Sequence, residues 1–231
     1  MAQPYDRVYD RATDVVRALY DRRISGPPVL DLDREFAPGA GFVEAWRSIR
    51  DEALAVARRL QEVPRFHEIM PEQASISAND GRDWRMYILK AYGVEQPEKM
   101  AACPQLAALV RNAPEVLSAS FSFLGPRKHI PPHRGPLRGI IRFYLVLAMP
   151  HEEDGSPAAA LKVANVEHRL DEGQFLLWDD TFEHEAWNGS DKLRIVLSLD
   201  VWRPHMPVDM RALSMILIQL VRIGIRIRGV G

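Results

Sequence analysis

The chain of 231 residues lacks several features that would assign it to whole classes of protein. Its one cysteine, Cys103, excludes an intrachain disulfide and is typical of a reducing compartment. No uninterrupted apolar run reaches the roughly 18–20 residues that cross a bilayer. The N-terminus has no basic region followed by an apolar stretch, so we expect no secretory signal. A cytoplasmic location is therefore expected.

An excess of charge of either sign is also lacking. The chain has 30 Lys and Arg against 31 Asp and Glu, which gives a net charge of −1 and no global field that would attract nucleic acid. Its apolar fraction of 47% is typical of a soluble globular protein. We expect a single domain with an N-terminal helical part (1–75), a β core (76–205) and a C-terminal tail (206–231).

Apolar residues recur at helical spacing in three places. They predict helices over 4–22, which Gly26-Pro27-Pro28 follows, over 42–62, and over 104–112. Polar residues 71–83 predict a loop.

Short apolar and aromatic runs dominate between these helices and the tail. They predict strands over 84–92, 116–124, 139–148, 159–166, 174–178 and 193–202. Many short strands with Gly, Pro and Asp turns between them indicate an antiparallel barrel or jelly roll. The expected fold class is mainly β with flanking helices.

The tail combines apolar residues with arginines. Residues 210–227 are rich in Leu, Ile, Val and Met, and arginines stand at 211, 222, 226 and 228. This composition predicts a basic amphipathic helix. Three placements remain open for it: on a membrane surface, docked on the barrel, or in a dimer contact. The oligomeric state is open as well.

Two histidines stand in unusual local settings. One ends the segment His129-Ile-Pro-Pro-His133, and the other, His184, follows the acidic turn Asp179-Asp-Thr-Phe-Glu. Neutral imidazole is a common ligand for iron and zinc, so His133 and His184 are candidate metal ligands. The alternative is two unrelated surface or core histidines. The prolines before His133 predict a rigid approach to a strand that begins at Gly139, not a strand interior.

An arginine in an apolar strand is the next candidate. Period-two alternation places Arg194, Val196, Ser198 and Asp200 on one strand face. A buried guanidinium needs an anionic partner, which is either a protein carboxylate such as Asp180 or Asp200, or the carboxylate of a ligand. Arg142 poses the same question in another predicted strand. With the histidines, these arginines indicate a metal and a small acidic cosubstrate.

Several motifs in order now carry a resemblance. They are Phe121-Ser-Phe-Leu, His133-Arg-Gly-Pro, Ile141-Arg-Phe-Tyr-Leu-Val-Leu, Asp179-Asp-Thr-Phe-Glu-His-Glu-Ala-Trp-Asn188 and the segment from Arg194 to Pro204. Over residues 84–204 the chain resembles the aspartyl/asparaginyl β-hydroxylase family of Fe(II)/2-oxoglutarate dioxygenases, which includes peptide-aspartate hydroxylases and bacterial lipid A hydroxylases. The resemblance implies a double-stranded β-helix core of the jelly-roll or cupin type. It also implies the cosubstrates 2-oxoglutarate and O₂, and hydroxylation of a C–H bond with release of succinate and CO₂.

The resemblance also implies roles for single residues. His133 and His184 match the iron-binding histidines, and Arg194 matches the arginine that pairs with the distal carboxylate of 2-oxoglutarate. Positions close to that cosubstrate are matched by Ser122, Arg142 and Trp84. Tyr144 stands where peptide-aspartate hydroxylases have a further histidine, and its phenol can still donate one hydrogen bond.

One departure concerns the third iron ligand. Most such dioxygenases have a carboxylate two residues after the first histidine, where this chain has Gly135. Peptide-aspartate hydroxylases share the glycine, and lipid A hydroxylases resemble the carboxylate version. Second-shell Asp179, Asp180 or Asp154 could offset the missing charge. The open position could also bind chloride, so halogenation is an alternative to hydroxylation.

Basic residues around the first histidine bear on the substrate. Arg127, Lys128, Arg134 and Arg138 lie there, and we expect Arg134 and Arg138 to bind an anionic group of a small-molecule, peptidyl or lipid substrate. The alternative is a solvated basic loop. Gly135 favours an amino-acid-derived substrate, whereas the tail favours a lipid acyl chain and peripheral contact with the inner face of the membrane. A non-catalytic binding or membrane-docking module is the third interpretation.

Overall fold

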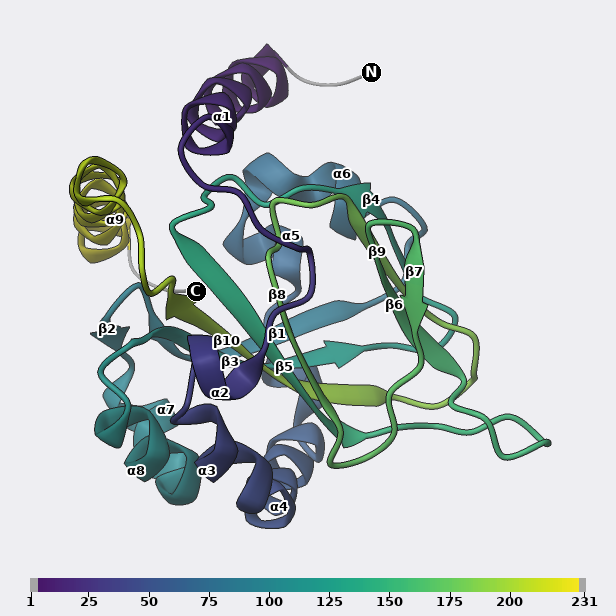
Figure 1. The fold of residues 1–231 in the computed structure, drawn as a ribbon. Coiled ribbons are helices and arrows are strands. Elements are labelled where there is room, and N and C mark those ends of the chain that lie inside the picture. The colour runs from purple at the N-terminus through teal and green to yellow at the C-terminus, as the bar shows by residue number, and fades with distance from the viewer. Residues whose placement is uncertain (1–3, 229–231) are drawn as a thin grey trace.

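The computed structural model describes residues 4–228, and the side chains of residues 13–227. Within these residues, two antiparallel sheets face each other, and helices surround the larger one (Figure 1). The larger sheet has the order β2 (Val94–Glu95), β1 (Trp84–Ala91), β3 (Val116–Leu124), β10 (Arg194–Trp202), β5 (Ile140–Ala148) and β8 (Phe175–Trp178). The smaller sheet has the order β4 (His129–His133), β9 (His184–Asn188), β6 (Ala159–Val163) and β7 (Val166–His168). The predicted fold class is confirmed.

The predicted strands lie close to the observed ones. The strand over 116–124 is found as predicted, and the others differ by one or two residues at their ends, except for 159–166. That segment forms two strands, because Ala164 and Asn165 adopt positive φ values of 46° and 70° and turn the chain into the hairpin β6–β7.

Both histidine-bearing strands, β4 and β9, were not predicted. The expectation that Pro131 and Pro132 keep the chain out of a strand is wrong. β4 is the edge strand of the smaller sheet and pairs only with β9 among the described strands. A proline on an edge strand removes no ladder hydrogen bond if its nitrogen faces away from the neighbour. The register shifts between Ile130 and His133, which accommodates the two prolines.

Helices cover the outer face of the larger sheet. α2 (Leu32–Glu35), α3 (Gly39–Glu44), α4 (Trp46–Ala57), α7 (Pro97–Ala102) and α8 (Pro104–Asn112) lie below it in Figure 1. The helix expected over 42–62 is thus divided among α3, α4 and a 3₁₀ turn at Leu60–Glu62. The loop expected over 71–83 begins with a 3₁₀ turn (Pro71–Gln73) and α6 (Ala74–Ser77), which follow α5 (Phe66–Ile69).

The alternation along β10 separates two apolar cores. Ile195, Leu197 and Leu199 pack against the helices, whereas Val196 packs between the two sheets. Arg194 shares the parity of Val196, so its side chain belongs to the interior between the sheets.

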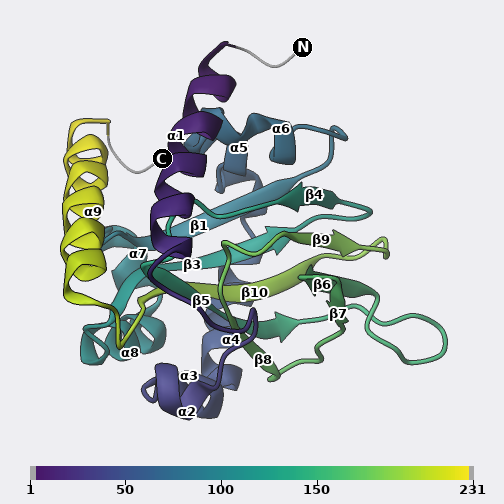
Figure 2. The ribbon, with the colours of Figure 1, turned by 45° about the horizontal axis from the view of Figure 1, so that its top comes forward.

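A third apolar cluster joins the terminal helices to the strand ends. α1 (Pro4–Asp21) and α9 (Val208–Arg228) lie side by side at one end of the molecule (Figure 2). The hydroxyls of Tyr20 and Ser214 are 2.6 Å apart, and Arg23 forms an ion pair with Asp209 at 2.9 Å. One face of the predicted tail helix is therefore docked on the core. Within residues 4–228 no helix is both long and apolar enough to cross a bilayer.

Candidate active site

His133 and His184 lie opposite each other on neighbouring strands. They are partners in the register of β4 with β9, and their ring centroids are 4.0 Å apart. His184 is buried and His133 is partly buried. The smaller sheet thus brings together two residues that are far apart in the sequence, as a shared metal ion would require.

Backbone carbonyls fix the tautomer of both rings. The Nδ1 of His133 lies 2.8 Å from the carbonyl oxygen of Pro131, and the Nδ1 of His184 lies 2.9 Å from that of Phe182. A carbonyl oxygen only accepts hydrogen bonds, so each Nδ1 carries the proton and donates. Each Nε2 therefore keeps its lone pair, and the hydrogen bond at Nδ1 orients the ring, as in many metal sites.

Burial keeps both imidazoles neutral. It lowers the pKa of His133 to about 4, and the nearby Arg142 adds to this effect. The pKa of His184 is held well below its usual value by burial and then by the charge that His133 would carry. At neutral pH both rings are in the form that binds a metal ion.

A third protein ligand is not arranged beside them. Among the residues that the structure describes, no group of three or more His, Cys, Asp and Glu side chains could hold a metal ion. At the position of the missing carboxylate, the backbone N–H of Gly135 donates to the carbonyl oxygen of Asp180 at 2.7 Å. A Cβ at position 135 would overlap the carboxylate of Asp180. The carboxylate of Asp180, which belongs to another segment, therefore lies next to the glycine.

Asp180 is a buried acid, and one of its two carboxylate oxygens forms an ion pair. Its Oδ2 lies 3.1 Å from Nη2 of Arg142, and within the described part of the chain its Oδ1 has no hydrogen-bond partner. Burial raises the pKa of Asp180 to about 6, although Arg142 opposes this shift. Of the three acids considered as a source of compensating charge, Asp180 is the one at the site. Asp154 is exposed and bonds to Ser156 in a loop.

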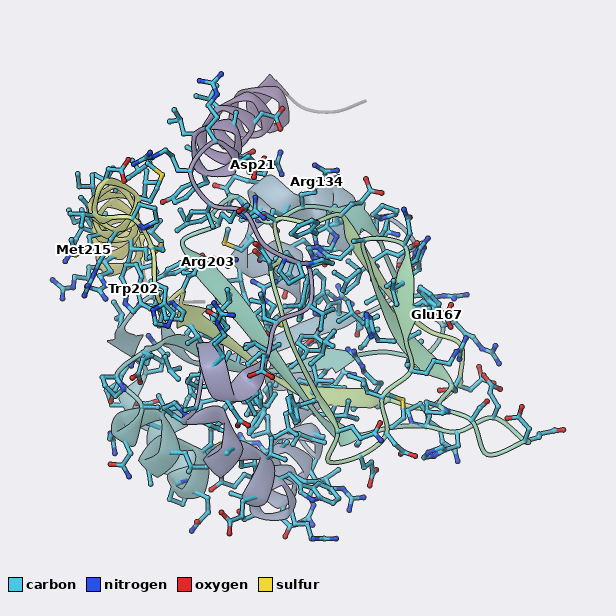
Figure 3. The ribbon with its side chains drawn as sticks, viewed as in Figure 1. Asp21, Arg134, Glu167, Trp202, Arg203 and Met215 are labelled. Carbon is cyan, nitrogen blue, oxygen red and sulfur yellow. The ribbon has the colours of Figure 1, made fainter. Side chains whose placement is uncertain are left out.

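Asp179 holds the turn that leads to His184. Its carboxylate accepts hydrogen bonds from the backbone N–H and hydroxyl of Thr181, from Arg203, and from Nε of Arg138 at 3.0 Å. Arg138 also donates to Asp21 at the end of α1, at 2.6 Å. Figure 3 labels Asp21 and Arg203. The guanidinium of Arg138 is buried and serves these two carboxylates, and its expected contact with a substrate stays a prediction.

The basic residues near the first histidine do not form a patch. Arg127 pairs with Asp191 at 2.8 Å. Lys128 is fully buried, and its ammonium group donates to Ser77, Asn79 and Asp80. Arg134, labelled in Figure 3, is exposed, unlike Lys128 and Arg138. Its expected role in substrate binding stays a prediction, as does that of Arg138.

Arg194 is a buried cation in the interior between the two sheets. The residue is 2% exposed, and neither its Nε nor its Nη1 has a hydrogen-bond partner among the residues that the structure describes. The carboxylates considered as its protein partners are engaged elsewhere, because Asp200 accepts from Nε and Nη2 of Arg142 at 3.0 and 2.9 Å, and Asp180 pairs with the same guanidinium. Buried polar atoms without partners are rare in proteins, and a buried guanidinium without an anion is costly. The site is thus suited to an anionic ligand.

Other predicted cosubstrate residues lie on the same interior face as this guanidinium. Arg194 lies over the ring of Tyr144, with its Cζ 5.1 Å from the centroid. Ser122 is the cross-strand partner of Val196, and its hydroxyl accepts from Nε1 of Trp84 at 3.0 Å. The hydroxyl proton of Ser122 is then available to a ligand. The sheet therefore gathers these residues on one interior face.

Two residues of this interior were not predicted. Trp178 lies with its ring centroid 4.5 Å from that of His184, and its Nε1 is buried without a partner. The alternation of Leu176 and Trp178 in β8 was the signal for its inward orientation. Phe66 stacks on Trp84 with centroids 3.9 Å apart, and nothing in its local sequence indicates this contact.

Comparison with known proteins gives this site a family. The sequence profile described as Aspartyl/Asparaginyl beta-hydroxylase matches residues 43–204, which include His133, His184 and Arg194. The chain belongs to the aspartyl/asparaginyl β-hydroxylase family. The resemblance carried by the sequence motifs is confirmed.

Curated relatives within and around this family have different names. The ornithine lipid ester-linked acyl 2-hydroxylase of Rhizobium tropici is 37% identical over 182 residues, which are 79% of this chain and 63% of that protein. The aspartyl/asparaginyl beta-hydroxylase of Homo sapiens is 29% identical over 171 residues, which are 72% of this chain and 21% of that protein. The hydroxylase-family chain thus spans less than two thirds of either relative. A prolyl-4-hydroxylase structure from Pseudomonas putida matches at 17% identity with a TM-score of 0.42, over 83% of this chain and 98% of that one.

Proposed function

We propose that this family member is an Fe(II)/2-oxoglutarate-dependent hydroxylase. The observation that carries the proposal is the pairing, in one buried interior, of two neutral imidazoles with the unpartnered guanidinium of Arg194. The two imidazoles are suited to a divalent metal ion, and the guanidinium is suited to a dicarboxylate. When bound, Fe(II) and 2-oxoglutarate supply the oxidation: one oxygen atom of O₂ enters a substrate C–H bond, the other enters succinate, and CO₂ leaves.

The residues present suit these groups. His133 and His184 would hold Fe(II) through their Nε2 atoms. Arg194 would bind the distal carboxylate of 2-oxoglutarate through Nε and Nη1, which have no partner among the described residues. Ser122 would donate a hydrogen bond from its hydroxyl to the same carboxylate. Tyr144 would stabilise the guanidinium of Arg194 through a cation–π contact. Trp84 holds the Ser122 hydroxyl in place for this role.

The remaining side chains would tune the site. Asp180 supplies a negative charge beside the metal position, and Arg142 holds its carboxylate there. Trp178 and the stacked pair of Phe66 and Trp84 form apolar walls that exclude water from the reacting C–H bond.

Hydroxylation is favoured over halogenation. The space beside Gly135, where an added anion would bind, is occupied by the Asp180 carboxylate. Two anions in contact within a buried site repel each other strongly. A chloride would therefore bind poorly while Asp180 is ionised.

For the substrate we propose the acyl chain of an amino-acid-containing lipid. The support is the 37% identity to a relative named for an ornithine lipid. This class of substrate is also consistent with both sequence features. Gly135 favours an amino-acid-derived substrate, and the apolar tail favours a lipid acyl chain. An aspartyl or asparaginyl side chain is the second candidate, supported by the human relative.

Cofactor binding can be tested before any substrate is known. Under anaerobic conditions, Fe(II) and 2-oxoglutarate together should give the weak visible charge-transfer band of a chelate. His184→Ala and Arg194→Met should weaken or remove the band, and His151→Ala, in an exposed loop, should leave it unchanged. A wild-type protein with no band and no stabilisation by 2-oxoglutarate would refute the proposal and favour a non-catalytic module.

Substrate class can then be tested by succinate release. Purified ornithine lipids, other lipid extracts, free amino acids and Asp-containing peptides would be compared at equal concentration, with oxygen uptake as a second readout. Release that depends on lipid and yields a hydroxylated acyl chain supports the first candidate. Release that depends on an amino acid or peptide supports the second.

A further inference from the structure

Exposed apolar side chains are concentrated at one end of the molecule. Among the side chains that the structure describes, nine of the ten exposed large apolar ones lie on α9 and α1, and Val166 on β7 is the tenth. Met215 on α9 is labelled in Figure 3, at the edge of the molecule. Single exposed apolar residues are ordinary on protein surfaces, whereas a group of this size marks an interaction site.

Five apolar residues of α9 form an exposed stripe. Ala212, Ile216, Leu220, Ile223 and Ile227 recur every three or four residues and are exposed. The opposite side of the helix, with Met210, Ser214 and Ile218, is buried against the core. The helix is thus apolar on both sides, and only one side is covered by the side chains that the structure describes.

The charges of α9 are mainly positive. Its basic residues are Arg211, Arg222, Arg226 and Arg228, and its one acidic residue is Asp209. Asp209 is paired with Arg23 on α1. Arg222 donates to the backbone oxygen of Tyr92 and ties the helix to the larger sheet. A positively charged border beside an apolar stripe is the composition of helices that lie in the interface of an anionic bilayer.

We propose that the outer face of α9 docks this protein on the surface of an anionic lipid bilayer. In this arrangement Ile216, Leu220, Ile223 and Ile227 enter the acyl boundary, and Arg211 and Arg226 contact lipid phosphates. A second copy of the chain is the less suitable occupant. Two α9 stripes in contact would bring arginines together with no free carboxylate of α9 to pair with them.

The docking face is connected to the candidate active site through α1. α1 packs on α9 through Tyr20 and Ser214. From the same helix, Nη1 of Arg17 lies 3.5 Å from the carbonyl oxygens of Arg134 and Gly135, which follow His133. A docked molecule would thus hold the His133 end of β4 in a fixed position relative to the membrane. Docking does not rest on the proposed function, because it requires neither metal nor cosubstrate.

Vesicle binding of the metal-free protein tests the proposal. We expect the protein to co-sediment with vesicles of phosphatidylcholine and phosphatidylglycerol and to bind pure phosphatidylcholine much more weakly. Ile223→Glu should weaken binding at least about tenfold, because it places a charge in the apolar boundary. Arg226→Gln should weaken binding to the anionic vesicles about fivefold and change binding to neutral ones little. Val166→Glu is the matched control, since Val166 is 54% exposed and Ile223 is 53% exposed.

The outcomes separate the two occupants. Ile223 is exposed, so its replacement should leave thermal unfolding unchanged, and circular dichroism would verify this. Wild-type protein that fails to bind anionic vesicles, or Ile223→Glu that binds as well as Val166→Glu, overturns the proposal. So does a wild-type dimer that Ile223→Glu converts to a monomer without any vesicle binding, because the stripe is then an interface between two copies.

Discussion

The carboxylate of Asp180 lies against the backbone of Gly135, in the space that a side chain at position 135 would need. The two residues are also joined by a backbone hydrogen bond of 2.7 Å. In the two-histidine-one-carboxylate arrangement, that space belongs to the carboxylate of the residue two positions after the first histidine. Here the carboxylate of Asp180, from the turn before the second histidine, lies in that space, although the described residues arrange no third metal ligand. The glycine and the aspartate are therefore one feature of the site.

Replacing the glycine should be harmful only while Asp180 is present. Gly135→Ala is expected to lower the free energy of unfolding by about 1–3 kcal/mol, because the new methyl group overlaps the carboxylate. In an Asp180→Ala background the same replacement should cost much less. Urea unfolding of the four proteins measures the coupling. Equal costs in both backgrounds would contradict the contact.

Removing the charge of Asp180 should weaken metal binding. Asp180→Asn keeps the shape of the side chain, and we expect Fe(II) or Mn(II) affinity to fall about 10–100-fold. In the wild type, affinity should also fall as the pH drops below about 6, where the carboxyl of Asp180 takes up a proton. The variant should lose this part of the pH dependence. Anaerobic calorimetric titration measures both effects, and Asp154→Asn, in an exposed loop, is the control.

The strand positions were predictable because they depend on local alternation. β3 was predicted to the residue, and the same alternation gave the inward orientation of Arg194. β4 and β9 were missed because their pairing is between distant segments, and the prolines of β4 are tolerated only at a sheet edge. Edge position is a property of the finished sheet.

The partners of the charged residues were not predictable for the same reason. Arg138 donates a hydrogen bond to Asp21, which is 117 residues away on α1, although its own segment is basic. Asp180 occupies the space at Gly135 from a separate turn. The sequence indicated that a side chain is absent at 135, but not what fills its place. Local sequence predicts which face a residue occupies, and tertiary packing decides its partner.

Arg194 should lower the stability of the ligand-free protein. Its buried guanidinium has no anionic partner among the described residues, so Arg194→Met is expected to leave the free energy of unfolding unchanged or to raise it. The same variant should lose the rise in melting temperature that 2-oxoglutarate gives the wild type. Arg194→Lys should retain part of that rise, since it keeps the charge but not the planar pair of donors. A strong loss of stability in Arg194→Met without ligand would indicate an unrecognised protein partner.

The histidine pair should make the metal-free protein sensitive to acid. The folded-state pKa of His133 is about 4, against an ordinary value of 6.5, so unfolding takes up a proton between these values. This contribution to stability is present above about pH 6.5 and is lost as the pH falls toward 4. At about pH 5 the loss of stability, relative to about pH 7, should amount to about 1–2 kcal/mol. Urea unfolding at about pH 7 and about pH 5 should show a smaller loss of stability for His133→Gln than for the wild type. An equal loss would show that His133 is not the group responsible.

The thiol of Cys103 should behave in the opposite direction at high pH. Burial, and then Glu52, raises its pKa to about 12, so the folded protein keeps the proton when an exposed thiol would lose it. Stability from this group is present below the ordinary pKa of 9 and is lost as the pH rises from there toward 12. Iodoacetamide should therefore label the folded chain only as fast as it unfolds, and label it at once in urea. Cys103→Ala should remove this part of the alkaline loss of stability. Rapid labelling of the folded wild type would show that the thiol is accessible.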